Sequence, residues 1–262
     1  MAVKIAAVGD NCMDVYENLS KAYPGGNPVN VSVYFVRMGG EASYTGVVGS
    51  DSYGALLKKA VSEKGVDTTH VRTVEGSTAI THVELIDGER VMGDYEEGVL
   101  ENFTLTAEDV EYLGNQELVV SALWGNCQQY FPMIREKGAK IAYDAATRPE
   151  DDAAKEAIPY VNYLFFSAEE DTPALRAQMQ ALFEQGPELV VATLGEHGSL
   201  AFDGKEFIAH GITPCPVVDT MGAGDSYIAG FLFGILSKES IPTCMQHGAD
   251  SSAVTIGYFG AW

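Results

Sequence analysis

The sequence has little positive charge. Lysine and arginine together account for 16 residues and aspartate and glutamate for 37, so the formal net charge is −21 at pH 7. An electrostatic field of that sign repels nucleic-acid phosphates and anionic lipid headgroups. We therefore expect no nucleic-acid and no membrane partner. An anionic substrate must be held by backbone amides, by a cation or by a few basic side chains.

Long hydrophobic runs and cysteines are also scarce. The longest hydrophobic run without charge covers residues 226–237, which falls short of the roughly 20 residues that a membrane-spanning helix needs. The N-terminal residues lack the basic start and the long apolar segment of a signal peptide. The four cysteines lie far apart and form no C-x-x-C pair, as is typical of reduced thiols in the cytosol. These features predict a cytoplasmic protein.

Several catalytic signatures are missing. The sequence contains no G-x-x-x-x-G-K-[ST], which excludes a P-loop enzyme. It contains neither H-E-x-x-H nor G-x-S-x-G, so zinc hydrolysis and serine-hydrolase chemistry lack support. No G-x-G-x-x-G follows the first predicted strand, which argues against a dinucleotide-binding dehydrogenase.

What the sequence does contain is an alternation of apolar runs and helical stretches. The apolar runs are typical of strands buried on both faces of a parallel sheet, and they cover residues 3–8, 44–48, 117–122, 140–143, 163–166 and 189–193. Crossover helices are predicted between them at residues 53–63, 128–136 and 173–184. This alternation predicts an α/β fold with a doubly wound, mostly parallel sheet, in a single domain over residues 1–262.

Two predicted β-hairpins depart from the alternation. Residues 78–85 and 90–95 alternate polar and apolar side chains and are joined by Asp87-Gly88, a strong hairpin signal, so we expect a β-lid at about residues 78–100. A second hairpin covers residues 199–208. The pattern at residues 29–38 does not decide between a strand and a helix. The valines alternate as in a strand, while the flanking glycine pairs frame a helix of ordinary length.

The segment DTMGAGDS at residues 219–226 is the strongest candidate for chemistry. Small residues there lead directly into an apolar helix, so the amides of Gly222, Ala223 and Gly224 are placed to form an anion cradle. A carboxylate inside such a cradle repels a bound phosphate. Asp225 therefore suits a general base that takes a proton from a hydroxyl attacking phosphorus. The alternative is that Asp225 only caps the helix.

This segment resembles the C-terminal signature of the ribokinase-like (phosphofructokinase-B type) carbohydrate kinases. The N-terminal signature of that family is matched by GGNPVNVS at residues 25–32. Other parts also follow in the family's order over essentially the whole chain, including VGSDSYG at 48–54 and TLGEHG at 193–198. The resemblance implies a ribokinase-like, Rossmann-like fold with a β-lid, the activity of an ATP-dependent sugar kinase, and a helix at residues 28–38.

Site residues are implied by the same resemblance, one position at a time. Asp225 matches the catalytic base, and residues 222–224 match the anion hole. The implied sugar contacts are Asp14, Gly26 and Asn30, with Asp10 and Gly25 beside them. Without the resemblance, Asp10 and Asp14 are more simply interpreted as turn residues at a strand end.

The resemblance also implies cofactors. The ATP site is expected at Thr193, Gly195, Gly198 and Gly224. Glu170 matches a carboxylate linked to Mg²⁺ through water, and Asp219 matches a position that helps to hold a monovalent cation such as K⁺ in some members. Two positions depart from the family. Ser167 replaces the asparagine of its N-x-x-E motif, and Ala249 falls where ribokinases have an asparagine near the adenine.

A less specific set of residues resembles the branch of this family that phosphorylates fructosamines such as fructoselysine. It includes GDNC at 9–12, GDY at 93–95 with EGV at 97–99, WG at 124–125 and GAW at 260–262. A fructosamine carries a cationic amine, and the lid holds Glu84, Asp94, Glu96 and Glu97, which could pair with that amine. The alternative is that these are solvated charges that protect exposed strand edges.

We therefore predict an ATP-dependent kinase of a primary hydroxyl on a ketose-type sugar, with fructoselysine as the first candidate. A fructokinase-type kinase of an unmodified ketose remains an alternative. A sugar-sensing protein without turnover is a more remote one, because Asp225 and the cradle are intact. Lids of this kind often pair between two chains, so we expect a homodimer through residues 78–100.

Overall fold

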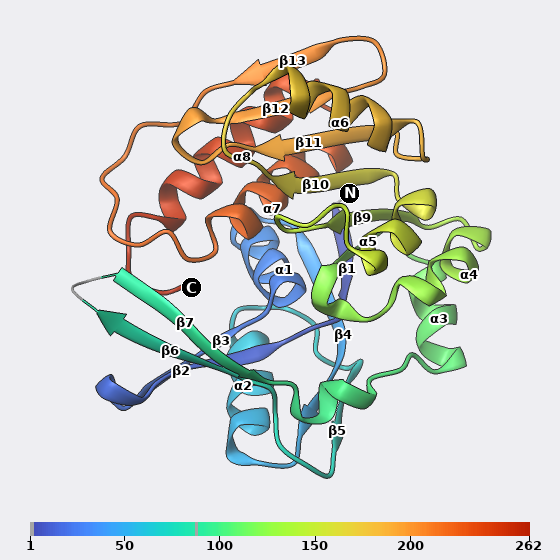
Figure 1. The fold of residues 1–262 in the computed structure, drawn as a ribbon. Coiled ribbons are helices and arrows are strands. Elements are labelled where there is room, and N and C mark those ends of the chain that lie inside the picture. The colour runs from blue at the N-terminus through green and yellow to red at the C-terminus, as the bar shows by residue number, and fades with distance from the viewer. Residues whose placement is uncertain (1–2, 87–88) are drawn as a thin grey trace.

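The computed structural model describes residues 3–86 and 89–262. The turn predicted at Asp87-Gly88 lies outside the described residues. Within the described part, the chain forms a large central sheet covered by helices and a smaller sheet beside it (Figure 1).

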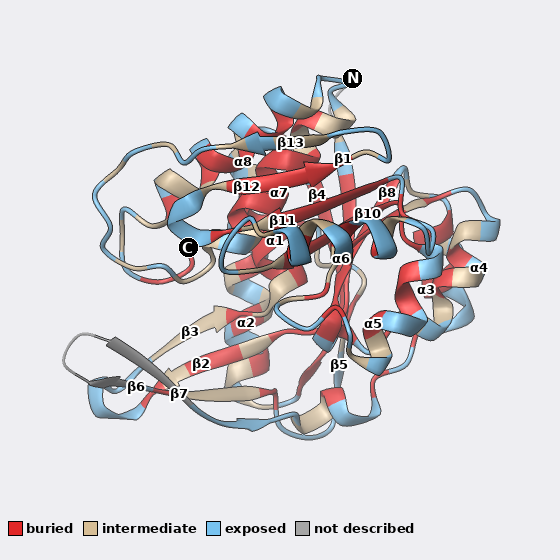
Figure 2. Cartoon of the chain, turned by 45° about the horizontal axis from the view of Figure 1, so that its top comes forward, coloured by how far each residue is buried: buried red, intermediate tan, exposed pale blue. Residues whose placement is uncertain are grey.

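The central sheet has nine strands in the described part of the chain, in the order β13-β12-β11-β10-β9-β8-β1-β4-β5. Their bounds are β1 Lys4–Val8, β4 Glu41–Gly49, β5 Val71–Val74, β8 Leu118–Ala122, β9 Lys140–Asp144, β10 Tyr163–Ser167, β11 Leu189–Thr193, β12 Ser199–Phe202 and β13 Phe207–His210. Only β12 and β13 run antiparallel to their neighbours among these strands. Figure 2 shows the central strands buried almost throughout. The expected doubly wound, mostly parallel sheet is confirmed.

Helices cover both faces of this sheet. On one face lie α1 Asn27–Arg37, α2 Ser52–Glu63, α7 Ala223–Leu236 and α8 Ile241–Thr255. On the other lie α3 Ala107–Gly114, α4 Phe131–Glu136, α5 Asp152–Ala157 and α6 Pro173–Phe183. Helices α2, α4 and α6 match predicted stretches, whereas α3, α5 and α8 were not predicted.

Helix α1 resolves the ambiguous segment as a helix. Its residues from Pro28 to Phe35 are all buried, because the helix packs against the sheet and also against α7. A helix buried on most of its sides carries apolar residues all round, so the alternating valines gave a false strand pattern. Pro28 lies in the first turn, where proline is tolerated.

The position of β1 determines where a ligand can bind. Strand β1 lies between β4 and β8. The chain adds β4 and β5 on one side of β1 and then places β8 on the other side. In open α/β sheets, ligands bind at the carboxyl ends of the strands where the order reverses in this way. Asp10 follows β1 and Asp144 ends β9, so both lie at this edge.

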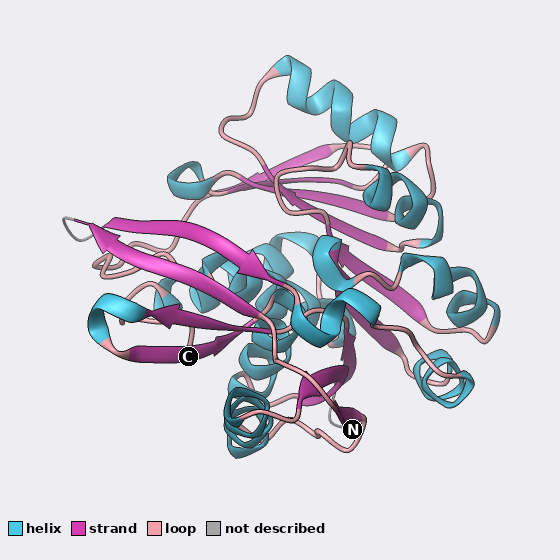
Figure 3. Cartoon of the chain, turned by 60° about the horizontal axis from the view of Figure 1, so that its bottom comes forward, coloured by secondary structure: helices cyan, strands magenta, loops and turns pink. Residues whose placement is uncertain are grey.

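The lid is a four-stranded sheet in the described residues, ordered β3-β2-β6-β7. Strands β6 Ile80–Ile86 and β7 Glu89–Glu96 are the predicted hairpin. Strands β2 Cys12–Tyr16 and β3 Lys21–Gly25 were not predicted. Figure 3 shows the lid strands as a layer of their own beside the central sheet. The lid therefore combines the predicted segment with residues 12–25.

Two further observations concern the described residues alone. None of their helices is long and apolar enough to cross a bilayer. Their four cysteines, Cys12, Cys127, Cys215 and Cys244, are all free thiols.

Candidate active site

Asp225 lies in the first turn of α7, and two asparagines hold its carboxylate. Asn27 Nδ2 donates to Asp225 Oδ1 at 2.6 Å, and Asn30 Nδ2 donates to Asp225 Oδ2 at 2.7 Å. The N-cap of α7 is Gly222, and no side chain caps this helix. The carboxylate of Asp225 is therefore turned toward α1 and does not cap its own helix.

Two more carboxylates surround the same asparagine. Asn27 Nδ2 also donates to Asp144 Oδ2 at 2.7 Å, and the Asn27 backbone amide donates to Asp10 Oδ2 at 3.2 Å. Burial, together with the charges of Asp144 and Asp10, raises the pKa of Asp225 to about 8, against the opposing effect of the two asparagine donors. Burial also raises the pKa of Asp10 and that of Asp144 to about 6. The pKa of the Asp225 carboxyl is thus close enough to neutral pH for the group to exchange a proton there.

Glycines bring α1 against the end of β1. Gly26 has a φ of +105°, and a Cβ there would collide with the Asn11 backbone. A Cβ on Gly25 would lie 2.9 Å from Asp14 Oδ2. Only glycine permits this close turn. The predicted sugar contacts therefore lie where the end of β1, the lid strands β2 and β3 and the start of α1 meet: Asp10, Asp14, Gly25, Gly26 and Asn30.

The predicted anion cradle has the geometry of an open helix start. Gly222 has a φ of +72°, and a Cβ there would collide with the Tyr34 hydroxyl. The Ala223 amide donates to the Thr220 carbonyl at 3.2 Å, so one of the three expected donors already has a partner. A Cβ on Gly224 would meet no atom within 4 Å. The exposed Gly224 therefore borders open space at the start of α7, and a helix start with room beside it is where an anion can bind.

The predicted nucleotide loop follows β11. Gly195 and Gly198 have φ values of +56° and +89°, and a Cβ on Gly198 would collide with the His210 carbonyl. Ser167 Oγ and Thr193 Oγ1 share a hydrogen bond of 2.9 Å. The serine that replaces the family's asparagine is therefore linked to the first residue of this loop. Ala249 is buried in α8.

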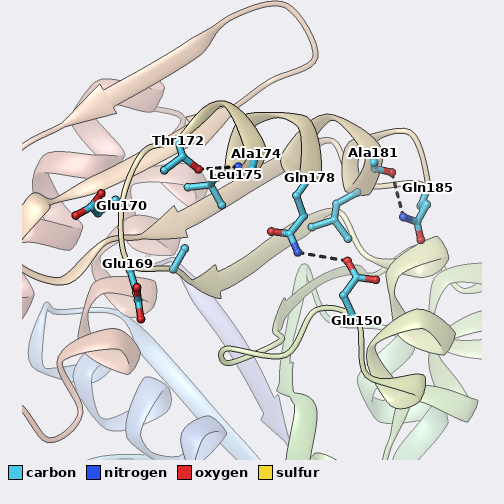
Figure 4. A pocket seen from close by; sticks show the side chains of 11 residues that line it. Glu150, Glu169, Glu170, Thr172, Ala174, Leu175, Gln178, Ala181 and Gln185 are labelled. Carbon is cyan, nitrogen blue, oxygen red and sulfur yellow. Dashed lines mark hydrogen bonds between the residues drawn. The ribbon is translucent and has the colours of Figure 1, made fainter.

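The expected magnesium-linked residue, Glu170, lines a cavity whose lining includes no member of the Asp225 cluster. Glu170 is exposed on the loop between β10 and α6, and with Glu169 and Thr172 it lines a cavity of about 680 Å³ (Figure 4). In the part of the chain that the structure describes, no group of three or more His, Cys, Asp or Glu side chains is arranged to hold a metal ion. Mg²⁺ bound to ATP is held mainly by phosphates and water, so a single nearby carboxylate such as Glu170 fits an outer role.

Asp219 serves as a backbone anchor in the structure. Its Oδ1 accepts from the Met221 amide at 3.0 Å and its Oδ2 accepts from the Gly260 amide at 2.7 Å. Its expected role toward a monovalent cation stays a prediction.

The prediction from sequence missed two members of the cluster. Asn27 lies inside the recognised signature but was not named as a site residue, although it contacts all three carboxylates. Asp144 was not named either, although it directly follows the apolar run at residues 140–143. Its position at the carboxyl end of a buried strand was the signal that could have identified it.

Comparisons with known proteins show what the whole chain is similar to. The family profile described as pfkB family carbohydrate kinase matches residues 4–262. The "Fructoselysine 6-kinase" of Shigella flexneri is 43% identical over 98% of this chain and 99% of its own length. The "Fructosamine kinase FrlD" of Bacillus subtilis is 29% identical over 99% of this chain and 93% of its own. An Arabidopsis thaliana ribokinase solved with ribose and ATP superposes with a TM-score of 0.86 at 20% identity, covering 99% of this chain and 94% of that one.

Proposed function

The chain belongs to the pfkB family of carbohydrate kinases, and we propose that it transfers the γ-phosphoryl group of ATP to the carbon 6 hydroxyl of fructoselysine. The observation that carries this proposal is the Asp225 carboxylate, held by Asn27 and Asn30 at the open start of α7. The substrate is drawn from the relative that is 43% identical over nearly the full length of both chains and is named a fructoselysine 6-kinase.

Asp225 acts as the general base in this proposal. It accepts the proton of the carbon 6 hydroxyl while that oxygen attacks the γ-phosphorus in line with the leaving ADP oxygen. The amides at the start of α7 stabilise the negative charge that develops on the transferred group. Asp14, Gly26 and Asn30 orient the sugar so that carbon 6 points at Asp225.

Kinases of this family use ATP, and we propose that Thr193, Gly195 and Gly198 line its site together with the start of α7. Bound Mg²⁺ would neutralise charge on the phosphates, and Glu170 is the residue that would hold it through water. The K⁺ dependence, the cytoplasmic location and the single-domain organisation expected from the sequence stay predictions.

The lid provides a partner for the amine of a fructosamine. Glu96 accepts from His82 at 3.0 Å, and this hydrogen bond, with the charge of Glu17, raises the pKa of His82. Glu96 is therefore already paired. Burial first, and then the charges of Asp10, Cys12 and Glu97, raise the pKa of Tyr95, which indicates that Asp10 and Glu97 each lie near Tyr95. Of the four lid carboxylates, we propose Glu97 as the partner of the substrate amine.

A screen of ADP release tests the proposal. The purified protein is assayed with MgATP and fructoselysine, glucoselysine, fructose, tagatose, ribose and nucleosides, and the product's phosphorylated carbon is identified by NMR. A charged hydrogen bond contributes about 1.5–3 kcal/mol, so kcat/KM for fructoselysine should exceed that for fructose by at least about tenfold. Equal values contradict the fructosamine assignment and support the fructokinase-type alternative. No turnover with any sugar contradicts the kinase proposal.

A further inference from the structure

The last residues of the chain reach into the candidate active site. Trp262 Nε1 donates to Asn30 Oδ1 at 2.7 Å, and Asn30 Nδ2 donates to Asp225 Oδ2 at 2.7 Å. These residues form a relay from the indole to the proposed base. Figure 1 shows this end of the chain between the lid and the start of α1.

Several contacts hold the segment in place. The Gly260 amide donates to Asp219 at 2.7 Å, and the Tyr34 hydroxyl donates to the Ala261 carbonyl. The Lys64 ammonium lies 5.5 Å from the centre of the Trp262 ring. The segment is therefore docked independently of the indole's own hydrogen bond.

The chemistry of the indole determines the orientation of the Asn30 amide. An asparagine amide can rotate by half a turn and exchange its oxygen with its nitrogen, but an indole N–H can only donate. Asn30 must therefore turn Oδ1 toward Trp262, which leaves Nδ2 facing Asp225. The reversed amide would bring its oxygen against a carboxylate oxygen and leave the indole N–H without this acceptor.

We propose that Trp262 is a positioning residue, which holds the Asn30 amide in the one orientation that donates to the Asp225 carboxylate. The proposal rests on Asp225 acting as the base. The resemblance to sugar kinases includes this tryptophan as part of a motif and implies no role for it.

Loss of the indole donor has a defined electrostatic consequence. The Asn30 donor lowers the pKa of Asp225, so an amide free to rotate lets that pKa rise. The other titratable groups that act on Asp225 are Asp10 after β1, Asp144 at the end of β9 and Tyr34 on α1. Because these are unchanged in a Trp262 variant, the shift reports on the relay.

The test is the pH dependence of kcat in Trp262→Phe, which keeps an aromatic ring and removes the donor. A charged hydrogen bond corresponds to a pKa change of about one unit. The acid limb of kcat should therefore move up by about one pH unit, so that kcat at pH 7 falls about tenfold and the deficit shrinks as the pH rises. KM for both substrates should change little.

Tyr258→Phe is the matched control. Its hydroxyl accepts from Arg37 at 2.9 Å and donates to the Ala261 carbonyl at 3.0 Å, so the variant loses hydrogen bonds of the same segment without touching Asn30. Its acid limb should stay in place. In an Asn30→Ala background, Trp262→Phe should add no further shift, because the two changes remove one relay.

An unmoved acid limb in Trp262→Phe, or equal shifts in Trp262→Phe and Tyr258→Phe, overturns the proposal while leaving the kinase assignment intact. A spectroscopic measurement tests the relay separately from the kinase assignment. The protein has two tryptophans, and the indole N–H signal that Trp262→Phe abolishes should titrate in wild type and lose that titration in Asp225→Asn. A signal that does not titrate also overturns the relay, whether or not the protein turns over sugar.

Discussion

At the scale of single residues, the proton affinity of Asp225 connects the structure to the chemistry. Burial among Asp10 and Asp144 gives this carboxylate a pKa of about 8, and a protonated carboxyl cannot accept the proton of the sugar. The kcat/KM for the sugar should therefore rise with pH and level off above about pH 8, because kcat/KM reports the free enzyme.

The control for this profile is Asp203→Asn, which makes the same chemical change in an exposed turn where backbone amides from Lys205 and Glu206 hold the pKa of the carboxyl low. Its profile should match that of the wild type. A wild-type kcat/KM that is flat between about pH 5.5 and 8.5 contradicts the assignment of an elevated pKa to the base.

Single residues also show how far the sequence could lead. The roles of Asp225 and the glycines before it were expected from their types and spacing, because small residues ahead of an apolar helix have few other uses. The contact between Trp262 and Asn30 could not be predicted, since the two residues lie 232 positions apart and no local pattern marks a long-range hydrogen bond. Asp144 could be identified as a site residue only once the order of the strands was known.

At the scale of elements, the start of α7 combines a strained turn with an open cradle. Gly222→Ala places a Cβ against the Tyr34 hydroxyl at a φ of +72°. We expect it to lower the free energy of unfolding by about 1 kcal/mol or more and to reduce kcat. Gly224→Ala meets no atom within 4 Å, and alanine favours a helix by up to about 1 kcal/mol.

Gly224→Ala should therefore keep or raise stability in urea unfolding and yet weaken MgATP binding, because its methyl group enters the space proposed for phosphate. Unchanged MgATP affinity in Gly224→Ala contradicts the placement of the phosphate site at this helix start.

The lid supplies the second prediction at this scale. Glu97→Gln should erode the preference for fructoselysine over fructose in kcat/KM by roughly tenfold, while fructose turnover is spared. Asp94→Asn is its control, because it neutralises another exposed lid carboxylate that is also close to Tyr95 in the sequence. If both variants lose the preference for fructoselysine to the same extent, the preference comes from the overall negative charge of the lid. It would then not come from a specific pair between Glu97 and the substrate amine.

Strands β2 and β3 show why the lid was only half predicted. Strand β2 begins four residues after β1 ends and carries Asp14 at its centre, and β3 contains Pro24 and Gly25. Proline, glycine and aspartate all weaken a strand pattern. These strands exist because β2 pairs with β6 far along the chain, with Met13 opposite Ile80. The fold of the central sheet was predictable because its strands are continuous apolar runs.

At the scale of the whole molecule, the excess of negative charge agrees with a site that holds phosphate through backbone amides. The expected oligomeric state depends on the lid, since its strands form a separate sheet beside the central sheet. We expect a homodimer through residues 78–100, with about twice the chain mass of 28.1 kDa in light scattering. A monomer at assay concentration removes this prediction without affecting the proposed chemistry.

The general-base role of Asp225 is tested most directly by the kcat of Asp225→Asn with MgATP and fructoselysine. Asparagine keeps the shape of the side chain and cannot accept the proton, and loss of a general base costs about 10²–10⁴-fold. We expect kcat to fall by that factor, with nucleotide and sugar affinities nearly unchanged by calorimetry. An Asp225→Asn variant that retains more than roughly a tenth of the wild-type kcat contradicts the assignment of Asp225 as the base.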